Sequence, residues 1–246
     1  MDERPLAIVT GAARGLGAAC ARALCDDGFA VCLLDRDAEG LDRAVAGIAA
    51  SGGSAEAMVV DLLDEAAVPR AVGGHPARGR LKALVNAAGL ISLGTIEDIT
   101  VDDWDRVLGV KLRGAFLTCK AAIPIMAENG GGAIVNIASM SGRTKSVATA
   151  PNYVASNAGM IGLTMTLAAQ HARQNVRVNA VAPGLIDTPM LHAYRAEQLD
   201  AIRATIPVGR FADPAEIAAV VSFLVSDKAS YITGETINAN GGMFMV

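Results

Sequence analysis

Aromatic residues are scarce in this sequence: they make up 4% of the 246 residues, whereas 52% are hydrophobic. A core with so few rings has to be built from aliphatic side chains, which is typical of parallel sheets covered by helices. A chain of this length can bury about three quarters of the surface that it exposes when extended. We therefore expect one folded domain over residues 1–246, and the composition disfavours a disordered chain or a coiled coil.

Cysteine and histidine are few and scattered. The four cysteines have no CxxC spacing, and the three histidines lie far apart. A metal site needs several such ligands close together, so no metal-binding pattern is visible. Because a free thiol behaves as a small hydrophobic group, we expect reduced and mostly buried cysteines at Cys20, Cys25, Cys32 and Cys119.

Runs of one charge and long hydrophobic runs are also missing. The 21 basic and 25 acidic residues give a net charge of -4 without such a run, which argues against nucleic acid and favours small-molecule partners. No hydrophobic run is long enough to span a membrane, and the charged start MDERP leads directly into LAIVT, which leaves no room for a signal peptide. We expect a cytoplasmic protein that binds neither nucleic acid nor a membrane.

Short runs rich in β-branched residues recur along the chain, with segments of helical length between them. These runs cover residues 6–10, 30–35, 57–61, 83–89, 133–139, 176–184 and 236–242. Their alternation with helices indicates βαβ units, and hence an α/β fold with a doubly wound parallel sheet and helices on both faces. The segment 188–210 fits no strand, and we interpret it as a helical insertion over the ligand crevice.

The first predicted strand leads into a glycine-rich loop, TGAARGLG at residues 10–17, and a helical segment follows. Glycines in such a loop let the main chain approach a pyrophosphate, whose charge then meets the free N–H groups at the helix start. Three glycines alone could form no more than a tight turn. Their position between a strand and a helix favours a dinucleotide site at Gly11, Gly15 and Gly17.

The second predicted strand ends at Asp35, eighteen residues after Gly17. An acidic residue near this distance accepts hydrogen bonds from the adenosine ribose and repels the 2′-phosphate of NADP, which favours NAD. Arg14 and Arg36 could partly offset this repulsion, and Asp35 could instead do no more than begin a turn. Asp61, at the end of the third predicted strand, is a candidate partner for the adenine.

Several motifs, in this order, resemble the short-chain dehydrogenase/reductase family: TGAARGLG (10–17), NAAG (86–89), Ser139, Tyr153, VAPG (181–184) and the terminal GG (241–242). The likeness extends from Leu6 to Gly242 and implies a Rossmann-like parallel sheet of about seven strands. Because many members of that family are tetramers, the resemblance also implies a homo-oligomer, a tetramer or a dimer.

By this resemblance Tyr153 is the general acid/base, and Ser139 hydrogen-bonds the substrate carbonyl or alcohol. The loop 86–89 shapes the cofactor site, and the stretch 183–188 holds the nicotinamide carboxamide. With the glycine-rich loop and its surroundings, the predicted cofactor-binding residues are Gly11, Arg14, Gly15, Leu16, Gly17, Asp35, Arg36, Asp61, Leu62, Asn86, Ala87, Gly89, Pro183, Gly184, Ile186 and Thr188.

Two positions depart from the family pattern. The family has a lysine four residues after the tyrosine, where this chain has Asn157, and an asparagine where this chain has Lys111. A phenol, with an ordinary pKa of about 10, needs a nearby positive charge to exchange protons near neutral pH. We hypothesise that the two residue types are exchanged and that Lys111 supplies this charge. The alternative is a solvated lysine and an impaired enzyme. The predicted catalytic residues are Ser139, Tyr153, Lys111 and Asn157.

Together these inferences predict an NAD(H)-dependent oxidoreductase that interconverts a secondary alcohol and a ketone by hydride transfer. The main alternative is a catalytically silent NAD-binding sensor or scaffold protein. A methyltransferase is a weaker alternative, because its cofactor has no phosphate for the glycine-rich loop. Apolar residues favour an apolar substrate, unless they are plain core; they are Leu90, Ile91, Met140, Leu185, Met190, Leu191 and Tyr194.

Two further features allow more than one interpretation. Arg143 and Lys145, after the strand that ends at Ser139, could attract an acidic substrate or a carrier protein, or could belong to a solvated loop. The C-terminal segment GGMFMV is apolar, which indicates burial against another subunit or against the chain's own sheet.

Overall fold

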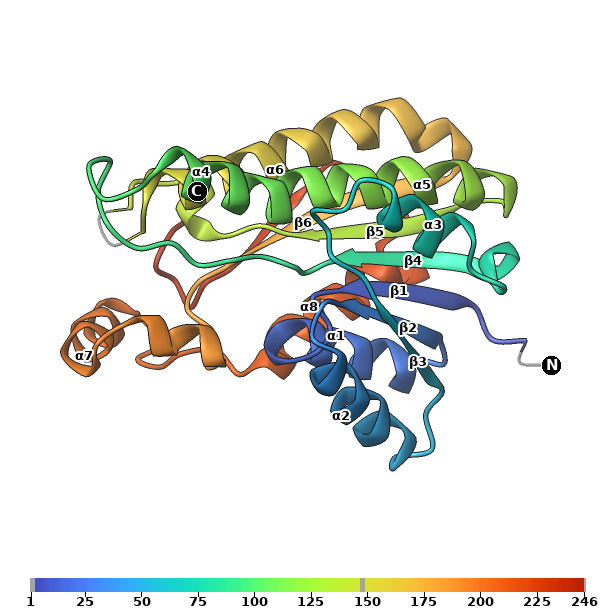
Figure 1. Cartoon of the computed structure of the whole chain (residues 1–246), viewed down its shortest axis with the longest axis horizontal. Helices are drawn as coiled ribbons and strands as arrows, with labels where there is room; N and C mark the ends of the chain where they lie inside the picture. The colour runs from blue at the N-terminus through green and yellow to red at the C-terminus, as the bar shows by residue number, and fades with distance from the viewer. Residues whose placement is uncertain (1–2, 147–148, 246) are drawn as a thin grey trace.

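The computed structural model describes residues 3–146 and 149–245, and its centre is a sheet of seven parallel strands (Figure 1). The strands follow the order β3-β2-β1-β4-β5-β6-β7. In chain order they are β1 (Leu6–Thr10), β2 (Ala30–Asp35), β3 (Ala55–Val59), β4 (Leu81–Asn86), β5 (Gly132–Ile137), β6 (Val176–Pro183) and β7 (Thr236–Ala239). The predicted α/β fold with a doubly wound sheet is confirmed.

β1 lies in the interior of the sheet, third in the strand order, and all five of its residues are buried. Its neighbours are β2 on one side and β4 on the other, so the chain winds outward from this point in both directions. The loops that follow β1 and β4 therefore separate at the carboxyl edge of the sheet. Open α/β sheets bind their ligands in the crevice that forms at such a point.

Helices cover both faces of the sheet (Figure 1). One face carries α1 (Gly15–Asp26), α2 (Ala38–Ala49) and α8 (Pro214–Val225); the other carries α3 (Ala67–Gly73), α4 (Val101–Leu108), α5 (Gly114–Glu128) and α6 (Pro151–His171). A buried, largely aliphatic cluster lies under each layer. The remaining helical elements are η1 (Arg78–Arg80), η2 (Gly109–Arg113), η3 (Met140–Gly142), η4 (Ala172–Gln174), η5 (Pro189–Ala193), α7 (Ala196–Thr205) and η6 (Asp227–Ala229).

The turn of helix between α4 and α5 is unusual. It is η2, a π-helix, in which the main-chain bonds run over five residues instead of four. Such wide turns are frequent at functional sites. This turn packs tightly on α6, because a Cβ at Gly159 would lie 2.7 Å from Leu112 Cδ2. The missing side chain at Gly159 therefore lets η2 approach the helix that carries Tyr153.

Two predicted strands are displaced in the structure: the run 83–89 corresponds to β4 at Leu81–Asn86, and the run 57–61 corresponds to β3. The run 57–61 was assigned by its apolar residues, but β3 spans Ala55–Val59, and Val60 and Asp61 already belong to the loop at the crevice. β3 is an edge strand whose residues are only partly buried or exposed, so hydrophobicity marks its ends poorly. The segment 188–210 contains η5 and α7, and α7 stands away from the sheet (Figure 1).

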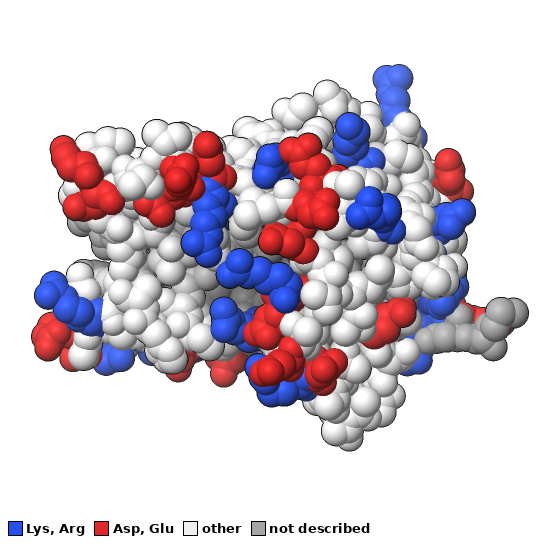
Figure 2. All heavy atoms as spheres, viewed as in Figure 1, with Lys and Arg blue, Asp and Glu red and all other residues white. Residues whose placement is uncertain are grey.

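The four cysteines are free and buried, as predicted. Within residues 3–146 and 149–245, no group of His, Cys, Asp and Glu side chains could hold a metal ion. No helix in this part of the chain combines the length and the hydrophobicity needed to cross a membrane. Basic and acidic side chains are interspersed on the face seen in Figure 2.

Candidate active site

The glycine-rich loop after β1 is packed too closely for side chains. A Cβ at Gly17 would lie 2.1 Å from the carbonyl oxygen of Gly11, and a Cβ at Gly11 would lie 2.7 Å from the Cα of Ala88. Gly11 and Gly15 also have φ angles of 67° and 57°, in the left-handed region that favours glycine. The loop therefore brings bare main chain to the crevice.

The start of α1 presents donors that no capping side chain satisfies. Arg14, at the N-cap position, makes no side-chain cap hydrogen bond, and the first turn contains no acidic residue. The first N–H groups of a helix need acceptors from elsewhere, and the helix dipole makes this end positive. A pyrophosphate supplies both acceptor oxygens and negative charge. The residues present here therefore fit a dinucleotide.

Asp35, at the end of β2, is anchored beside this loop. Its carboxylate accepts a hydrogen bond from the main-chain N–H of Ala13 at 3.2 Å and one from that of Asp37 at 3.1 Å. The negative charge therefore has a fixed position at one end of the crevice. Arg14 and Arg36 line the same crevice, but both are exposed.

A cavity of about 740 Å³ extends along the carboxyl edge of the sheet, from the glycine-rich loop to η5 and α7. All of the predicted site residues except Asn86 and Asn157 line it. The fold therefore brings together residues that are scattered along the chain. Sequence-based reasoning missed several further lining residues: Leu34, Val60, Val110, Ser141, Thr149, Ile202 and Met243.

Asn86 lies behind the cavity and not on its surface. Its Nδ2 donates to Oδ1 of Asn136 at 2.8 Å, and its Oδ1 accepts from Oγ1 of Thr118 at 2.7 Å. Asn136 in turn donates to Oγ1 of Thr164 at 2.9 Å. This buried network ties β4 and β5 to α5 and α6. The side chain of Asn86 thus supports the cavity wall from behind, and a contact of this residue with the cofactor stays a prediction.

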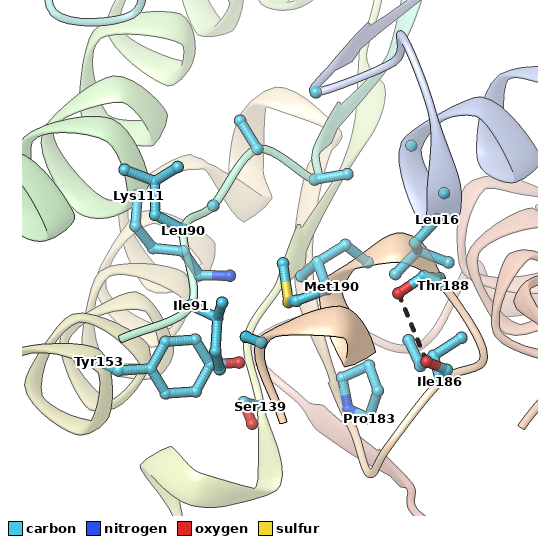
Figure 3. Close-up of a pocket in the computed structure, with 18 of the residues that line it drawn as sticks. Leu16, Leu90, Ile91, Lys111, Ser139, Tyr153, Pro183, Ile186, Thr188 and Met190 are labelled. Carbon is cyan, nitrogen blue, oxygen red and sulfur yellow. Dashed lines mark hydrogen bonds between the residues drawn. The ribbon is translucent and has the colours of Figure 1, made fainter. Parts of the chain in front are cut away.

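Ser139 and Tyr153 lie side by side in the cavity (Figure 3). The Oγ of Ser139, which follows β5, accepts from the N–H of Ser141 at 3.2 Å, so its own proton remains available for another acceptor. Tyr153 lies in the first turn of α6. Burial raises the pKa of its phenol, whereas hydrogen bonding with Ser139 and Asn157 lowers it. The phenol therefore needs further stabilisation of its anion to act near neutral pH.

Lys111 lies in η2 and is 5% exposed, which makes it the only buried lysine or arginine among the residues that the structure describes. Desolvation by burial lowers its pKa to about 8. Its stem fills the space at Gly89, where a Cβ would lie 3.1 Å from Cδ and 3.3 Å from Nζ of the lysine. Figure 3 shows the amine pointing into the cavity, as the hydroxyl of Tyr153 does. It is therefore not the solvated lysine of the alternative interpretation.

Asn157 lies behind Tyr153 and is fully buried. Its Nδ2 donates to the main-chain carbonyl of Tyr153 at 2.8 Å, while its Oδ1 has no hydrogen-bond partner in the described part of the chain. η3 packs directly against it, because a Cβ at Gly142 would lie 2.9 Å from the Asn157 Cβ. The side chain is thus confined to the interior and does not reach the cavity.

Residues 183–188 run along the cavity after β6. Gly184 packs against the chain that follows β7, since a Cβ there would lie 3.1 Å from the Cα of Asn240. The hydroxyl of Thr188 donates to the carbonyl of Ile186 at 3.4 Å (Figure 3). Thr188 also meets the glycine-rich loop, because a Cβ at Gly15 would lie 3.5 Å from its Cβ. This stretch therefore joins the two ends of the site.

The apolar residues predicted for a substrate pocket all line the cavity. η5 contributes Met190, α7 contributes Ile202, and the C-terminal segment contributes Met243. Methionine is flexible and fills irregular space, so this wall can adapt to the shape of a ligand. Tyr194 lines the cavity as well, and burial raises the pKa of its phenol to about 12.

Arg143 and the C-terminal segment pack on each other. Arg143 donates to the carbonyl of Thr236 and to Oδ1 of Asn238, both at 3.0 Å, and its guanidinium lies 5.7 Å from the centre of the Phe244 ring. Its side chain is therefore half-buried, and these contacts within the chain hold it in place. The described part of the C-terminal segment contacts the chain itself through Phe244, and Val246 lies outside the described residues. Lys145, in contrast, is exposed at the cavity.

Comparisons with known proteins extend these observations. A family model described as enoyl-(acyl carrier protein) reductase matches residues 11–244. The D-threitol dehydrogenase of Mycolicibacterium smegmatis is 39% identical over 96% of this chain and 92% of its own length. A 3-oxoacyl-[acyl-carrier-protein] reductase of Thermotoga maritima is 36% identical over 98% of both chains.

A solved structure is similar over the same extent. It is that of a Beutenbergia cavernae protein assigned as an NAD(P)-dependent gluconate 5-dehydrogenase, with bound NADP. The TM-score is 0.93 at 36% identity, and the match covers 97% of this chain and 96% of that one. The fold and the site thus define an oxidoreductase that uses a nicotinamide dinucleotide and acts on CH–OH or C=O groups. More specifically, the chain belongs to the short-chain dehydrogenase/reductase family.

Proposed function

We propose that the protein is an NAD(H)-dependent oxidoreductase that interconverts a secondary alcohol and a ketone. The proposal is carried by the convergence of Ser139, Tyr153 and Lys111 on one cavity that also contains the uncapped start of α1. The glycine-rich loop, Asp35 and the stretch 183–188 would hold the dinucleotide, which supplies or accepts the hydride when bound.

Within this site Tyr153 exchanges the proton of the substrate. In oxidation its phenolate takes the hydroxyl proton of the alcohol, and in reduction its phenol returns a proton to the oxygen. Ser139 donates a hydrogen bond to the same oxygen and stabilises the negative charge that develops on it. Lys111 and Asn157 complete the proposed catalytic set.

We propose NAD rather than NADP as the preferred cofactor. Two main-chain N–H groups fix the carboxylate of Asp35, and a fixed negative charge near the adenosine ribose opposes a 2′-phosphate. The protein from Beutenbergia cavernae holds NADP, and Arg14 and Arg36 would favour it here. Because both arginines are exposed, solvent screens their charges more than that of the anchored carboxylate.

The apolar wall favours an apolar alcohol or ketone as the substrate. The names of the two relatives point in different directions, since one is called a dehydrogenase of D-threitol and the other a reductase of 3-oxoacyl chains on acyl carrier protein. A polyol needs several polar partners, whereas Met190, Ile202 and Met243 offer none. A ketone or alcohol with a hydrocarbon chain fits this lining better.

A silent NAD-binding sensor or scaffold is the second candidate. The observation that favours it is Asn157, which leaves the helix of Tyr153 without a positive charge one turn away. In this reading the fold binds the dinucleotide, and Tyr153 has no means to exchange a proton.

Binding and turnover assays with the purified protein distinguish the two functions. We expect NADH and NAD to bind in a calorimetric titration, and we expect absorbance changes of NADH with apolar ketones and secondary alcohols. The Tyr153→Phe variant should bind the cofactor without turnover. Cofactor binding by the wild-type protein with no turnover across a broad panel would instead support the sensor or scaffold.

We also propose a homo-oligomer, a tetramer or a dimer. Large apolar side chains stand exposed on three helices: Phe116 on α5 at 46%, Met165 on α6 at 53% and Phe223 on α8 at 41%. Burying them against another copy would remove this surface from water. Light scattering of the purified protein measures the mass directly, and a monomer would contradict this proposal. The cytoplasmic location stays a prediction.

A further inference from the structure

The geometry of the site singles out one source of positive charge. A phenolate beside a substrate needs a cation at close range. Besides Tyr153, the ionisable side chains of the described residues that line the cavity are Arg14, Asp35, Arg36, Asp61, Lys111, Lys145, His192 and Tyr194. Only Lys111 among them is buried, and the exposed ones are screened by water.

Packing confines the lysine from two sides. Leu112, the next residue in η2, lies against α6 at the position of Gly159, and the stem of Lys111 occupies the space over Gly89. The stem therefore cannot swing out to solvent without displacing the loop that follows β4. Its amine is directed into the cavity that the phenol of Tyr153 also lines (Figure 3).

Asn157 cannot supply the positive charge for Tyr153. It carries no charge, it does not line the cavity, and its Nδ2 is engaged by the main-chain carbonyl of Tyr153. It can instead hold the first turn of α6, and with it the backbone of Tyr153, in place. The charge and the support of the tyrosine thus come from two different helical elements.

We infer that Lys111, on the π-turn between α4 and α5, supplies the positive charge that Tyr153 needs, and that Asn157 is a positioning residue for Tyr153. This inference rests on the proposed function, because it gives the tyrosine its means of proton exchange. The amine also lies beside Gly89 in the wall of the dinucleotide cavity. The ionisation of the phenol and the affinity for the anionic dinucleotide should therefore both depend on Lys111.

The test compares Lys111→Met with Lys111→Arg, with the single variants Lys111→Asn and Asn157→Lys, and with the double exchange Lys111→Asn/Asn157→Lys. Lys120→Met is the matched control, because Lys120 is an exposed lysine on the neighbouring α5 that stacks on Phe116. Ultraviolet difference spectra follow the ionisation of Tyr153 with NAD bound, after subtraction of the spectra of Tyr153→Phe. Calorimetry measures the affinity for NAD.

For Lys111→Met we expect the pKa of Tyr153 to rise by about 1 to 3 units and the affinity for NAD to fall about tenfold. Lys111→Arg should retain most of both properties, and the double exchange should recover part of what Lys111→Asn loses. Lys120→Met should match the wild-type protein. If Lys111→Met also matches it in both measurements, the inference is wrong.

The outcomes separate this inference from the proposed function. If the wild-type protein turns over substrate and Lys111→Met equals it in turnover, tyrosine ionisation and NAD affinity, the proposed function stands and the inference is wrong. If the wild-type protein shows no turnover but Lys111→Met still shifts the ionisation of Tyr153, the two residues are coupled and the proposed function is wrong. Should Lys111→Met fold poorly, Lys111→Arg and Gly89→Ala carry the same measurements.

Discussion

The two ends of the cavity are built in different ways. The end at α1 is made by one continuous stretch, residues 10–17, through main-chain N–H groups and the absence of side chains. The end at Tyr153 is made by side chains that β5, α6 and η2 bring together. We therefore expect binding of the dinucleotide to depend mainly on local main-chain geometry, and proton chemistry to depend on how one helical element packs on another. Apart from Lys111→Met, each variant below is expected to act mainly at one end of the cavity.

The largest effect is expected for Tyr153→Phe. Loss of the phenolic hydroxyl removes the group that exchanges the substrate proton, so kcat should fall by about 10² to 10⁴, while the affinity for NAD should stay close to that of the wild-type protein. Steady-state kinetics and calorimetry measure the two quantities. Tyr231→Phe, at a fully exposed position, is the control and should change neither. A variant that keeps its kcat would contradict the role of Tyr153.

Lys111→Met should stabilise the fold while it impairs the site. Burial lowers the pKa of the lysine from 10.5 to about 8, so the buried charge lowers the free energy of unfolding below pH 8. Between pH 8 and 10.5 the unfolded chain holds a proton that the native protein does not, so the stability of the wild-type protein rises with pH in this window. Removing the amine should therefore raise the free energy of unfolding by on the order of 3 kcal/mol below pH 8.

Urea unfolding at several pH values measures this difference. The gap between Lys111→Met and the wild-type protein should narrow as the pH rises from 8 to 10.5. Lys120→Met, at an exposed position on α5, should show no such gap at any pH. A gap that does not depend on pH would show that packing and not charge is responsible.

Asp35→Ala should act at the other end of the cavity. Without the anchored carboxylate the 2′-phosphate of NADP is no longer repelled, so the ratio of kcat/KM for NADP to that for NAD should rise roughly tenfold or more. Asp42→Ala, an exposed acidic residue on α2, is the control for the change in net charge. An unchanged ratio would mean that Asp35 does no more than anchor the loop at Ala13 and Asp37.

Gly89→Ala is expected to have the smallest effect, and it tests the position of the Lys111 side chain rather than its charge. The new methyl group would lie 3.1 Å from Cδ of Lys111, so the flexible stem has to move by a few tenths of an ångström while the backbone stays in place. We expect kcat to fall about tenfold, since misplaced groups lose orientation. The unfolding midpoint should hardly change. Gly47→Ala, on α2 with no neighbour within 4 Å, is the control.

Several features of this molecule can be predicted from the sequence because they are local. The strands of the sheet interior are mostly aliphatic, and a glycine-rich loop between a strand and a helix has few possible uses. The edge strand β3 was displaced because its partly exposed residues carry no comparable pattern. The family motifs placed Ser139 and Tyr153 because each follows a strand or begins a helix at the crevice.

Other features could not be predicted, because they depend on the direction of side chains. The resemblance put Asn86 beside the cofactor, but its side chain turns into a buried network with Asn136 and Thr118. Ile202 and Met243 lie far apart in the sequence, and they line the cavity only because α7 and the C-terminal segment fold toward it. Neither residue belongs to a motif or to a periodic pattern that points to a ligand.

The residues alone thus specified an α/β chain with a dinucleotide loop and a tyrosine that needs a nearby cation, because strand hydrophobicity and glycine spacing act over a few neighbouring positions. The sequence also made Lys111 the candidate for this cation, and tertiary packing decided that its amine is buried at the cavity. A π-turn does not show in a helical period of 3.6, and only the contact of Leu112 with Gly159 and of Lys111 with Gly89 buries the amine at the cavity. Desolvation and direction of a side chain are properties of its surroundings, which no single segment contains.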